Sequence, residues 1–153
     1  MVWEAVGIDS KWLSCYSLSM TSALITSLII AMAPVFNINP MIAVAVATVE
    51  SDLNPKAIGG KGEVGLFQIM PQMYKRYGYT RKQMEDPVNN IYLGLVMLQD
   101  AKRTCVHKGD LTFLVCYNAG PTIAKRIKNP QKFAYIRKIK SKLIYILSTP
   151  REK

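Results

Sequence analysis

Residues 41–50 read Met-Ile-Ala-Val-Ala-Val-Ala-Thr-Val-Glu, an apolar run that ends in a carboxylate. No Asp, Glu, Lys or Arg lies between Lys11 and Glu50. This pattern predicts a buried helix over 41–51. Burial withdraws water from the carboxylate at the end of such a helix, which disfavours its charged form and raises its pKa. A carboxylic acid that stays protonated near neutral pH can serve as a general acid, so Glu50 is a candidate catalytic residue. The alternative is a solvated Glu at a helix C-terminus.

The positive charge of the chain is concentrated at its C-terminal end. The chain has 153 residues, half of them hydrophobic, which is enough for one domain with a core. Its net charge is +10, and residues 101–153 carry thirteen Lys or Arg against Asp110 and Glu152. Such a basic surface attracts nucleic acid, anionic lipid or acidic envelope polymers, or it is a solvated helical face. Since no nucleic-acid motif is present, we expect no specific nucleic-acid partner.

The three cysteines, Cys15, Cys105 and Cys116, are too few and too scattered for a metal site. The single histidine, His107, lies in a polar turn and is expected to be solvated. Cys105 and Cys116 fall on consecutive predicted helices joined by this turn. They can form a disulfide if the domain is exported, or they can remain two buried thiols, and Cys15 is then left over.

Residues 13–36 are apolar, uncharged and long enough to cross a bilayer. Ala31-Met-Ala33 has the pattern of a signal-peptide cleavage site, although the preceding segment is not basic and Pro34 follows the cut. Three interpretations remain open: a signal peptide, a membrane anchor, or a first helix buried by the rest of the fold. We predict a signal or anchor over 1–33, with membrane contact through 13–36.

From Pro40 onward, prolines and glycines divide the chain into helices with short connections. The first two expected helices cover 41–51 and 71–77, the second with Gly78 as its cap. A third begins at Pro87, and its apolar face consists of Ile91, Leu95, Leu98 and Ala101. A fourth covers 111–119 with Asp110 as N-cap and is closed by Gly120, and a short helix follows Pro121. The last begins after Pro130, and its apolar face consists of Phe133, Ile136, Ile139, Leu143 and Ile146.

The segment between Asp52 and Gly65 is turn-like and predicts a loop or a small hairpin. The predicted fold class is therefore all-α with at most a small β element. We expect a single domain over 34–147, preceded by the apolar N-terminal helix and followed by a basic tail over 148–153.

Four segments carry a resemblance to a known family: Glu50-Ser51, Gly65-Leu-Phe-Gln-Ile-Met-Pro71, Asn90-Ile91 with Gly94, and Tyr117-Asn-Ala-Gly120. In this order and spacing they resemble the catalytic domain of the soluble lytic transglycosylases, relatives of goose-type lysozyme. The resemblance runs from about Pro34 to Ile139. It implies a lysozyme-like domain of the α+β superfamily with minimal β structure, and it implies no cofactor and no metal.

The resemblance implies that Glu50 is the sole catalytic acid and base. Its counterpart protonates the glycosidic oxygen between N-acetylmuramic acid (MurNAc) and N-acetylglucosamine (GlcNAc). The resulting carboxylate then takes a proton from the muramyl 6-hydroxyl, which attacks the anomeric carbon and forms a 1,6-anhydro sugar. Ordinary glycosidases use two carboxylates for this bond. Asp52 is the only nearby second candidate, and it is expected to face solvent or to cap the helix.

Further residues match the substrate-binding positions of the family. By resemblance, Gln68 hydrogen-bonds the sugar amides and Met70 lines the cleft. Tyr117 and Asn118 face the acid and hold the acetamido sugar, with core packing as the alternative for Tyr117. Tyr135 matches a late tyrosine near the acid.

Ser51 can hydrogen-bond the acid or the substrate, or it can cap the helix end. Asn90 is expected to be structural and to support the cleft. The chain departs from the family at Phe67, where Met is usual, and at Glu63, where Ala is usual. The second departure adds a charge near the cleft rim.

The expected substrate is the glycan strand of peptidoglycan, in a bacterial envelope or periplasm reached by export, by anchoring or in a phage virion. A multiprotein envelope-crossing or virion assembly is an expected partner. Two alternatives remain: a hydrolytic muramidase on the same fold, and a structural subunit of a virion or secretion machine with secondary muralytic activity.

Overall fold

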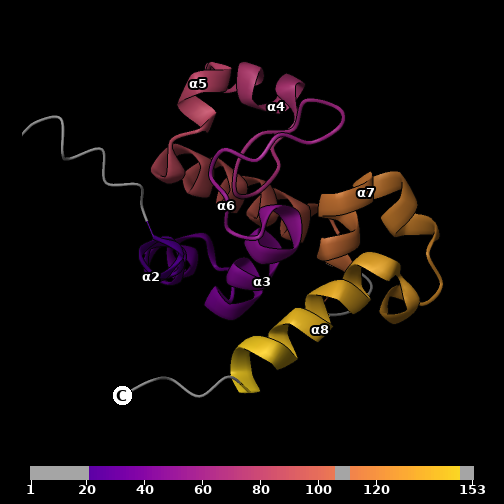
Figure 1. The fold of residues 1–153 in the computed structure, drawn as a ribbon. Helices are drawn as coiled ribbons and strands as arrows, with labels where there is room; N and C mark the ends of the chain where they lie inside the picture. The colour runs from indigo at the N-terminus through magenta and orange to yellow at the C-terminus, as the bar shows by residue number, and fades with distance from the viewer. Residues whose placement is uncertain (1–20, 106–110, 149–153) are drawn as a thin grey trace, which may run out of the picture.

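The computed structural model describes residues 21–105 and 111–148, which form a helical domain (Figure 1). Within these ranges the β structure is limited to isolated antiparallel bridges that join Ile58 to Val64 and Val64 to Ile69. The all-α prediction is therefore confirmed. The helices are α2 (Ser22–Met32), α3 (Pro40–Ser51), α4 (Pro71–Arg76), α5 (Arg81–Met84), α6 (Pro87–Thr104), α7 (Thr112–Arg126) and α8 (Ala134–Ser148), with 3-10 turns η2 (Ala33–Phe36) and η4 (Pro130–Lys132).

Helix α3 is the central helix, packed between α2 and α8. It begins at Pro40, one residue before the predicted start: the Asn39 side chain accepts hydrogen bonds from the Met41 and Ile42 amides, and Pro40 occupies the first turn. The small residues from Ala43 to Ala47 are buried, which lets neighbouring helices approach closely. The helix ends at Asp52, which takes a left-handed conformation (φ 52°) and is exposed.

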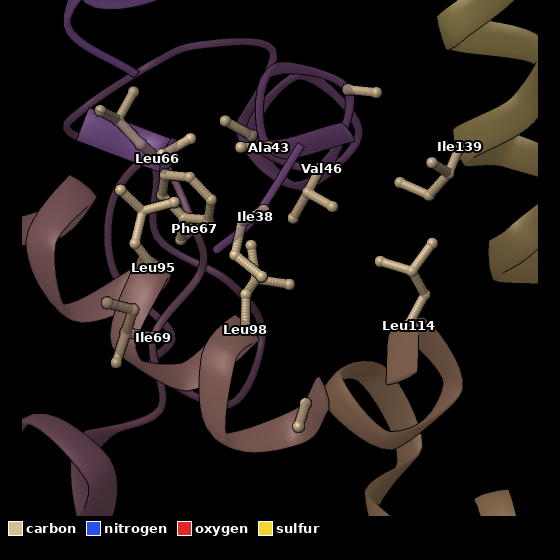
Figure 2. Close-up of a cluster of buried hydrophobic side chains, with 14 of the residues drawn as sticks. Ile38, Ala43, Val46, Leu66, Phe67, Ile69, Leu95, Leu98, Leu114 and Ile139 are labelled. Atoms are coloured by element: carbon tan, nitrogen blue, oxygen red, sulfur yellow. The ribbon is translucent and has the colours of Figure 1, made fainter. Parts of the chain in front are cut away.

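One continuous core joins α3, the loop before α4, α6, α7 and α8 (Figure 2). The four residues predicted for the apolar stripe of α6 are all buried, which confirms that prediction. Phe67 inserts against this helix at Gly94, where an added Cβ would collide with the phenyl ring. A glycine is therefore required at this position. Close packing against Phe67 explains why Gly94 belongs to the sequence motif.

Helix α2 packs against α3 and α6, with Ile25 and Ile29 inside the core. Among the residues that the structure describes, no helix is long and apolar enough to cross a membrane. Residues 22–32 thus form a helix that packs against the rest of the described domain, and the signal or anchor over 1–33 stays a prediction. The remainder of the segment before residue 21 lies outside the described residues.

One described helix was not expected from the sequence. This helix is α5, although Thr80 and Gln83 form a reciprocal capping box at its start. The proposed cap Asp110 lies outside the described residues, as does His107. Helix α7 begins after Leu111 and is interrupted at Gly120 (φ 83°, ψ 166°), which agrees with the predicted end of one helix there and the short helix predicted after Pro121.

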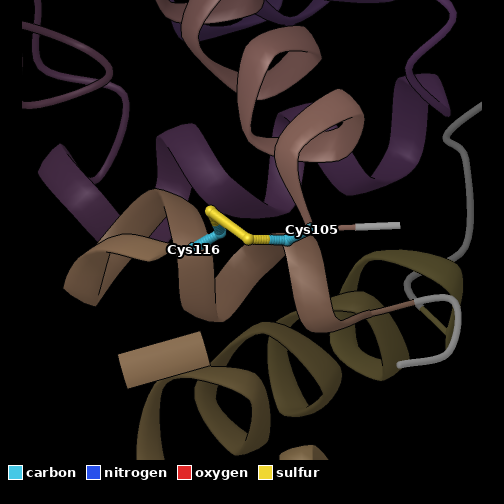
Figure 3. The surroundings of a disulfide bond; sticks show 2 residues. All are labelled: Cys105 and Cys116. Atoms are coloured by element: carbon cyan, nitrogen blue, oxygen red, sulfur yellow. A yellow bond between two sulfur atoms is a disulfide. The ribbon is translucent and has the colours of Figure 1, made fainter. Parts of the chain in front are cut away.

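The C-terminal end of α6 and the middle of α7 are joined by a disulfide between Cys105 and Cys116 (Figure 3). Their Cα atoms lie 6.3 Å apart, and both residues are buried. The disulfide therefore links two helices that already pack extensively against each other. Cys15 lies outside the described residues.

Candidate active site

Glu50 lies in the last turn of α3, half-buried, and accepts a hydrogen bond from the hydroxyl of Tyr135 on α8 at 2.5 Å. Burial raises the pKa of Glu50, and the negative charge of Glu63 raises it further. The Tyr135 hydrogen bond and the positive charge of Lys138 act in the opposite direction, but the net pKa is raised. The carboxyl group therefore keeps its proton to a higher pH than an exposed Glu does, as a general acid requires.

Two tyrosine hydroxyls near the acid remain protonated. Burial raises the pKa of Tyr117 well above its usual value, and the charge of Glu50 adds to this effect. The same two causes raise the pKa of Tyr135. Each hydroxyl therefore keeps a proton to donate in a hydrogen bond: Tyr135 donates to Glu50, and Tyr117 donates to the carbonyl of Phe67 at 2.7 Å.

The main chain at Leu66 and Phe67 is held by side chains from three helices. The Phe67 amide donates to Oδ1 of Asn90 on α6 at 2.9 Å, and the Phe67 carbonyl accepts from Tyr117 on α7. The Leu66 carbonyl accepts from the hydroxyl of Ser51 on α3 at 3.0 Å. Buried backbone groups need such partners. This loop is therefore fixed relative to the acid on α3.

The loop also requires a glycine at residue 65. Val64 and Ile69 pair as an antiparallel bridge, and the turn between them begins with Gly65 at φ 77°. A Cβ there would collide with the side-chain amide of Asn90, whose Nδ2 donates to the Val64 and Met84 carbonyls. Asn90 thus has the structural role expected of it.

Gln68 follows in a left-handed conformation (φ 46°), which is uncommon for a residue with a side chain. Its Nε2 donates to the carbonyls of Ala57 and Gly65 at 3.2 and 2.9 Å. No partner for its Oε1 lies within the described part of the chain. Gly59 lies beside this oxygen and the Glu63 carboxylate, and a Cβ at Gly59 would collide with both groups. The amide oxygen of Gln68 is thus left to accept a hydrogen bond from a ligand.

These residues surround a cleft of about 220 Å³ that contains Glu50. Five residues expected from the sequence lie around it, and Tyr135 reaches the acid by its hydrogen bond. Ser51 does not bond Glu50: its hydroxyl lies 3.0 Å from the carbonyls of both Leu66 and Ala47, so it ties the helix to the loop. The cleft is lined by Glu50, Gly59, Gly60, Glu63, Gln68, Met70, Met97, Tyr117 and Asn118.

Four lining residues were not among the predicted site residues. The Gly59-Gly60 pair stands in a segment whose composition indicated only a turn. Met97 lies on α6 outside the predicted apolar stripe, and no local pattern marks it. Glu63 was noted only as a departure from the family. Its Oε2 accepts a hydrogen bond from the Lys61 amide at 2.8 Å, and backbone hydrogen bonds lower its pKa, so it adds a second, ionised carboxylate to the cleft.

The chain is similar in sequence to known proteins. A family described as "Transglycosylase SLT domain" matches residues 27–140. A protein named "Transglycosylase" from Enterobacteria phage PRD1 is 35% identical over 86 residues, which cover 56% of this chain and 31% of that protein.

Two solved structures share the fold. An inactive mutant of lytic transglycosylase Slt from Pseudomonas aeruginosa superposes with a TM-score of 0.65 at 18% identity over 82% of this chain. The 70 kDa soluble lytic transglycosylase from Escherichia coli gives a TM-score of 0.65 at 23% identity over 80% of this chain. This chain covers 24% of each of those chains. At these identities the two structures bear on the fold alone.

Proposed function

Because the chain belongs to the transglycosylase SLT domain family, we propose that it is a peptidoglycan lytic transglycosylase. It would cleave the β-1,4 bond between MurNAc and GlcNAc and leave 1,6-anhydro-MurNAc ends. The observation that carries the proposal is Glu50, a half-buried acid with a raised pKa that lies in a cleft and is hydrogen-bonded by Tyr135. The other residues of the cleft support it.

In the proposed reaction Glu50 acts twice. The protonated carboxyl group gives its proton to the glycosidic oxygen as the bond from that oxygen to the anomeric carbon breaks. The carboxylate then removes the proton of the muramyl 6-hydroxyl, whose oxygen bonds to the anomeric carbon. The proton returns to Glu50 and no water is consumed. The Tyr135 hydroxyl stabilises the carboxylate between the two steps, because hydrogen bonds to a charged group are stronger than those to a neutral one.

We assign substrate binding to residues around the acid. The free Oε1 of Gln68 would accept an acetamido N–H of a sugar, because its Nε2 already donates to backbone carbonyls. The exposed Asn118 side chain, which also lines the cleft, would bond a sugar from α7. Met70 and Met97 supply apolar contacts to the sugar ring. Tyr117 would act by holding the loop, since its hydroxyl bonds the Phe67 carbonyl.

A second candidate is a hydrolytic muramidase on the same fold. Glu63 favours it, because this carboxylate lies in the same cleft and remains ionised. A second carboxylate in a glycosidase can activate water or stabilise positive charge at the anomeric carbon. The products separate the candidates, since hydrolysis leaves reducing ends and transglycosylation leaves anhydro ends.

The proposed setting is the cell envelope of a bacterium or a virion component that acts there. The match to a phage protein named "Transglycosylase" is compatible with both. Membrane contact through residues 13–36 and assembly with other envelope or virion proteins stay predictions.

The test is mass spectrometry of the muropeptides released from purified peptidoglycan by the wild type and by Glu50→Gln. We expect products lighter by one water than reducing muropeptides. We expect release to fall by roughly 10²–10⁴-fold in the variant, the usual contribution of a general acid. Reducing ends that depend on Glu50 would establish the muramidase instead. No release by the wild type would contradict both enzymatic proposals.

A further inference from the structure

Glu63 stands in the cleft at a position where Ala is usual in the related family, and the chain holds its carboxylate in place. The residue follows a tight turn in which the Gly62 amide donates to the Gly59 carbonyl at 3.0 Å. The Gly59 amide in turn donates to the Glu63 carbonyl at 2.8 Å. The Lys61 amide donates to Oε2 of the Glu63 side chain at 2.8 Å. The turn therefore fixes one oxygen of this carboxylate at the cleft.

The Glu63 carboxylate lies next to the amide oxygen of Gln68. A Cβ added to Gly59 would collide with Oε2 of Glu63 and with Oε1 of Gln68, since each oxygen would be less than 3.0 Å from it. The two oxygens are therefore close to a single point beside the Gly59 main chain. All three residues line the cleft. Because Nε2 of Gln68 donates to two backbone carbonyls, this side chain offers its oxygen to the cleft.

This part of the cleft is suited to a cationic hydrogen-bond donor. Backbone hydrogen bonds lower the pKa of Glu63, so its carboxylate is ionised at neutral pH. No Lys or Arg forms an ion pair with it within the described part of the chain, although the charge of the exposed Lys61 acts on it. An acetamido N–H has one hydrogen and satisfies only one of the two oxygens. An ammonium group has three, and at N···O distances of about 2.7–3.2 Å it can donate to both.

We propose that Glu63 and Gln68 make the cleft selective for de-N-acetylated glycan strands, in which a GlcNAc residue has become glucosamine and carries an ammonium group. This inference rests on the proposed function and specifies the form of its substrate. The ammonium would donate hydrogen bonds to Oε2 of Glu63 and to Oε1 of Gln68. With Ala at residue 63, as is usual in the related family, the same ammonium would find one acceptor and no negative charge.

The rest of the protein gives a cationic sugar no general attraction. The net charge of the chain is +10, so its long-range field repels a strand that carries free amines. The other carboxylate of the cleft, Glu50, has a raised pKa and carries its negative charge only at higher pH than an exposed Glu does. A preference for strands with free amines would therefore have to come from the acceptors at Glu63, and a substitution there tests it directly.

The test compares two substrates that differ only in their acetyl groups. One consists of glycan strands without peptide stems, from which the acetyl groups of GlcNAc have been removed enzymatically. The other consists of the same strands after chemical re-N-acetylation. The variant is Glu63→Gln, which removes the charge and keeps an oxygen for the Lys61 amide. The matched control is Glu85→Gln, which removes a carboxylate at the end of α5, outside the cleft.

The readout is the ratio of kcat/KM for the de-N-acetylated strands to that for the re-acetylated strands. An exposed ion pair contributes roughly two- to fivefold, so the wild-type ratio should exceed that of Glu63→Gln by about this factor at low salt. Salt should reduce the difference, and the control should keep the wild-type ratio. Effects of Glu63 on the acid or on water act on both substrates and cancel in the ratio. Equal ratios in the wild type and Glu63→Gln would therefore overturn the proposal.

A binding measurement separates this inference from the proposed function. Glu50→Gln protein is titrated calorimetrically with a β-1,4-linked glucosamine tetramer and with its N-acetylated form. The preference for the amine tetramer should fall by about two- to fivefold when Glu63→Gln is added. If no glycan is cleaved but this preference depends on Glu63, the inference stands and the proposed function fails. If anhydro products form but neither the ratio nor the affinities depend on Glu63, the proposed function stands and the inference is wrong.

Discussion

The two hollows beside Glu50 are built in opposite ways. Around the cleft of about 220 Å³, the side chains that hold the acid and the loop each have a defined hydrogen-bond partner: Tyr135, Tyr117 and Asn90. In the hollow of about 780 Å³ between α3 and α8, the cations Arg137, Lys138 and Lys142 are at least partly exposed and make no ion pair within the described residues. The larger hollow is thus not the one with the candidate acid. A catalytic group needs a fixed position, whereas an exposed cation without an ion-pair partner is not held in one position.

The first prediction tests the hydrogen bonds that hold the loop beside the cleft, and it has the largest expected effect. Asn90→Ala should lower the free energy of unfolding by about 3–5 kcal/mol, because it leaves the Phe67 amide and the Val64 and Met84 carbonyls without partners in the core. Urea denaturation measures the change.

The matched control is Asn89→Ala, one residue earlier on the same helix. Asn89 donates a single hydrogen bond, to the Gln83 carbonyl at 3.1 Å, in an exposed position. Its loss should cost about 1 kcal/mol or less. Equal losses for the two variants would show that Asn90 does not fix the loop in the way the hydrogen bonds indicate.

The same contrast explains how much could be predicted from the sequence. Local sequence patterns suffice to predict α3 and α6. An uncharged apolar run predicts α3, and apolar residues at helical spacing predict α6. The short helix α5 was missed although Thr80 and Gln83 formed a capping box. For α2, the sequence left three interpretations open, because only its packing against α3 and α6 distinguishes a core helix from a signal or anchor segment.

The features of the site that could not be predicted from the sequence depend on contacts between residues far apart in the chain. The motifs led to Glu50, Gln68 and Tyr117, which line one cleft. The partner of Ser51 could not be foreseen, because the Leu66 carbonyl comes within reach only after the loop folds back onto α3. The hollow between α3 and α8 depends on the packing of two helices far apart in the chain. A helix after Pro130 with one apolar and one basic face was predicted, but its packing against α3 was not.

The second prediction concerns the hydrogen bond between Tyr135 and the acid. Tyr135→Phe should lower kcat by roughly 10- to 100-fold, the usual effect of losing a hydrogen bond to a charged group. The bond stabilises the ionised form of Glu50, so its loss raises the pKa of Glu50 further. A general acid is active below its pKa, and the fall in activity on the alkaline side should therefore move to higher pH. A pH–rate profile measures both effects.

Tyr117→Phe is the control for this prediction. It also removes a hydroxyl beside the cleft, but one that bonds the Phe67 carbonyl rather than the acid. It should loosen the loop and raise KM without moving the alkaline fall in activity to higher pH. If both variants move the profile alike, the Tyr135 hydrogen bond is not the cause.

The third prediction has the smallest expected effect and asks whether Glu63 is part of the catalytic machinery or only tunes it. The negative charge of Glu63 raises the pKa of Glu50, so Glu63→Gln should lower that pKa and move the alkaline fall in activity to lower pH, opposite to Tyr135→Phe. Because Glu63 lies at the cleft rim, salt should weaken the effect. Glu85→Gln, which removes a carboxylate from the end of α5, should leave the profile unchanged.

The size of the rate change in Glu63→Gln decides between the two enzymatic proposals. If Glu63 only tunes the acid, the maximal rate should stay within about threefold of the wild type, since one proton donor and acceptor suffices for transglycosylation. If Glu63 activates water, the maximal rate should fall by roughly 10²-fold or more, as for the loss of a general base. The products should then carry reducing ends. A large fall in rate with anhydro products would contradict both assignments and would give Glu63 a role in stabilising positive charge at the anomeric carbon.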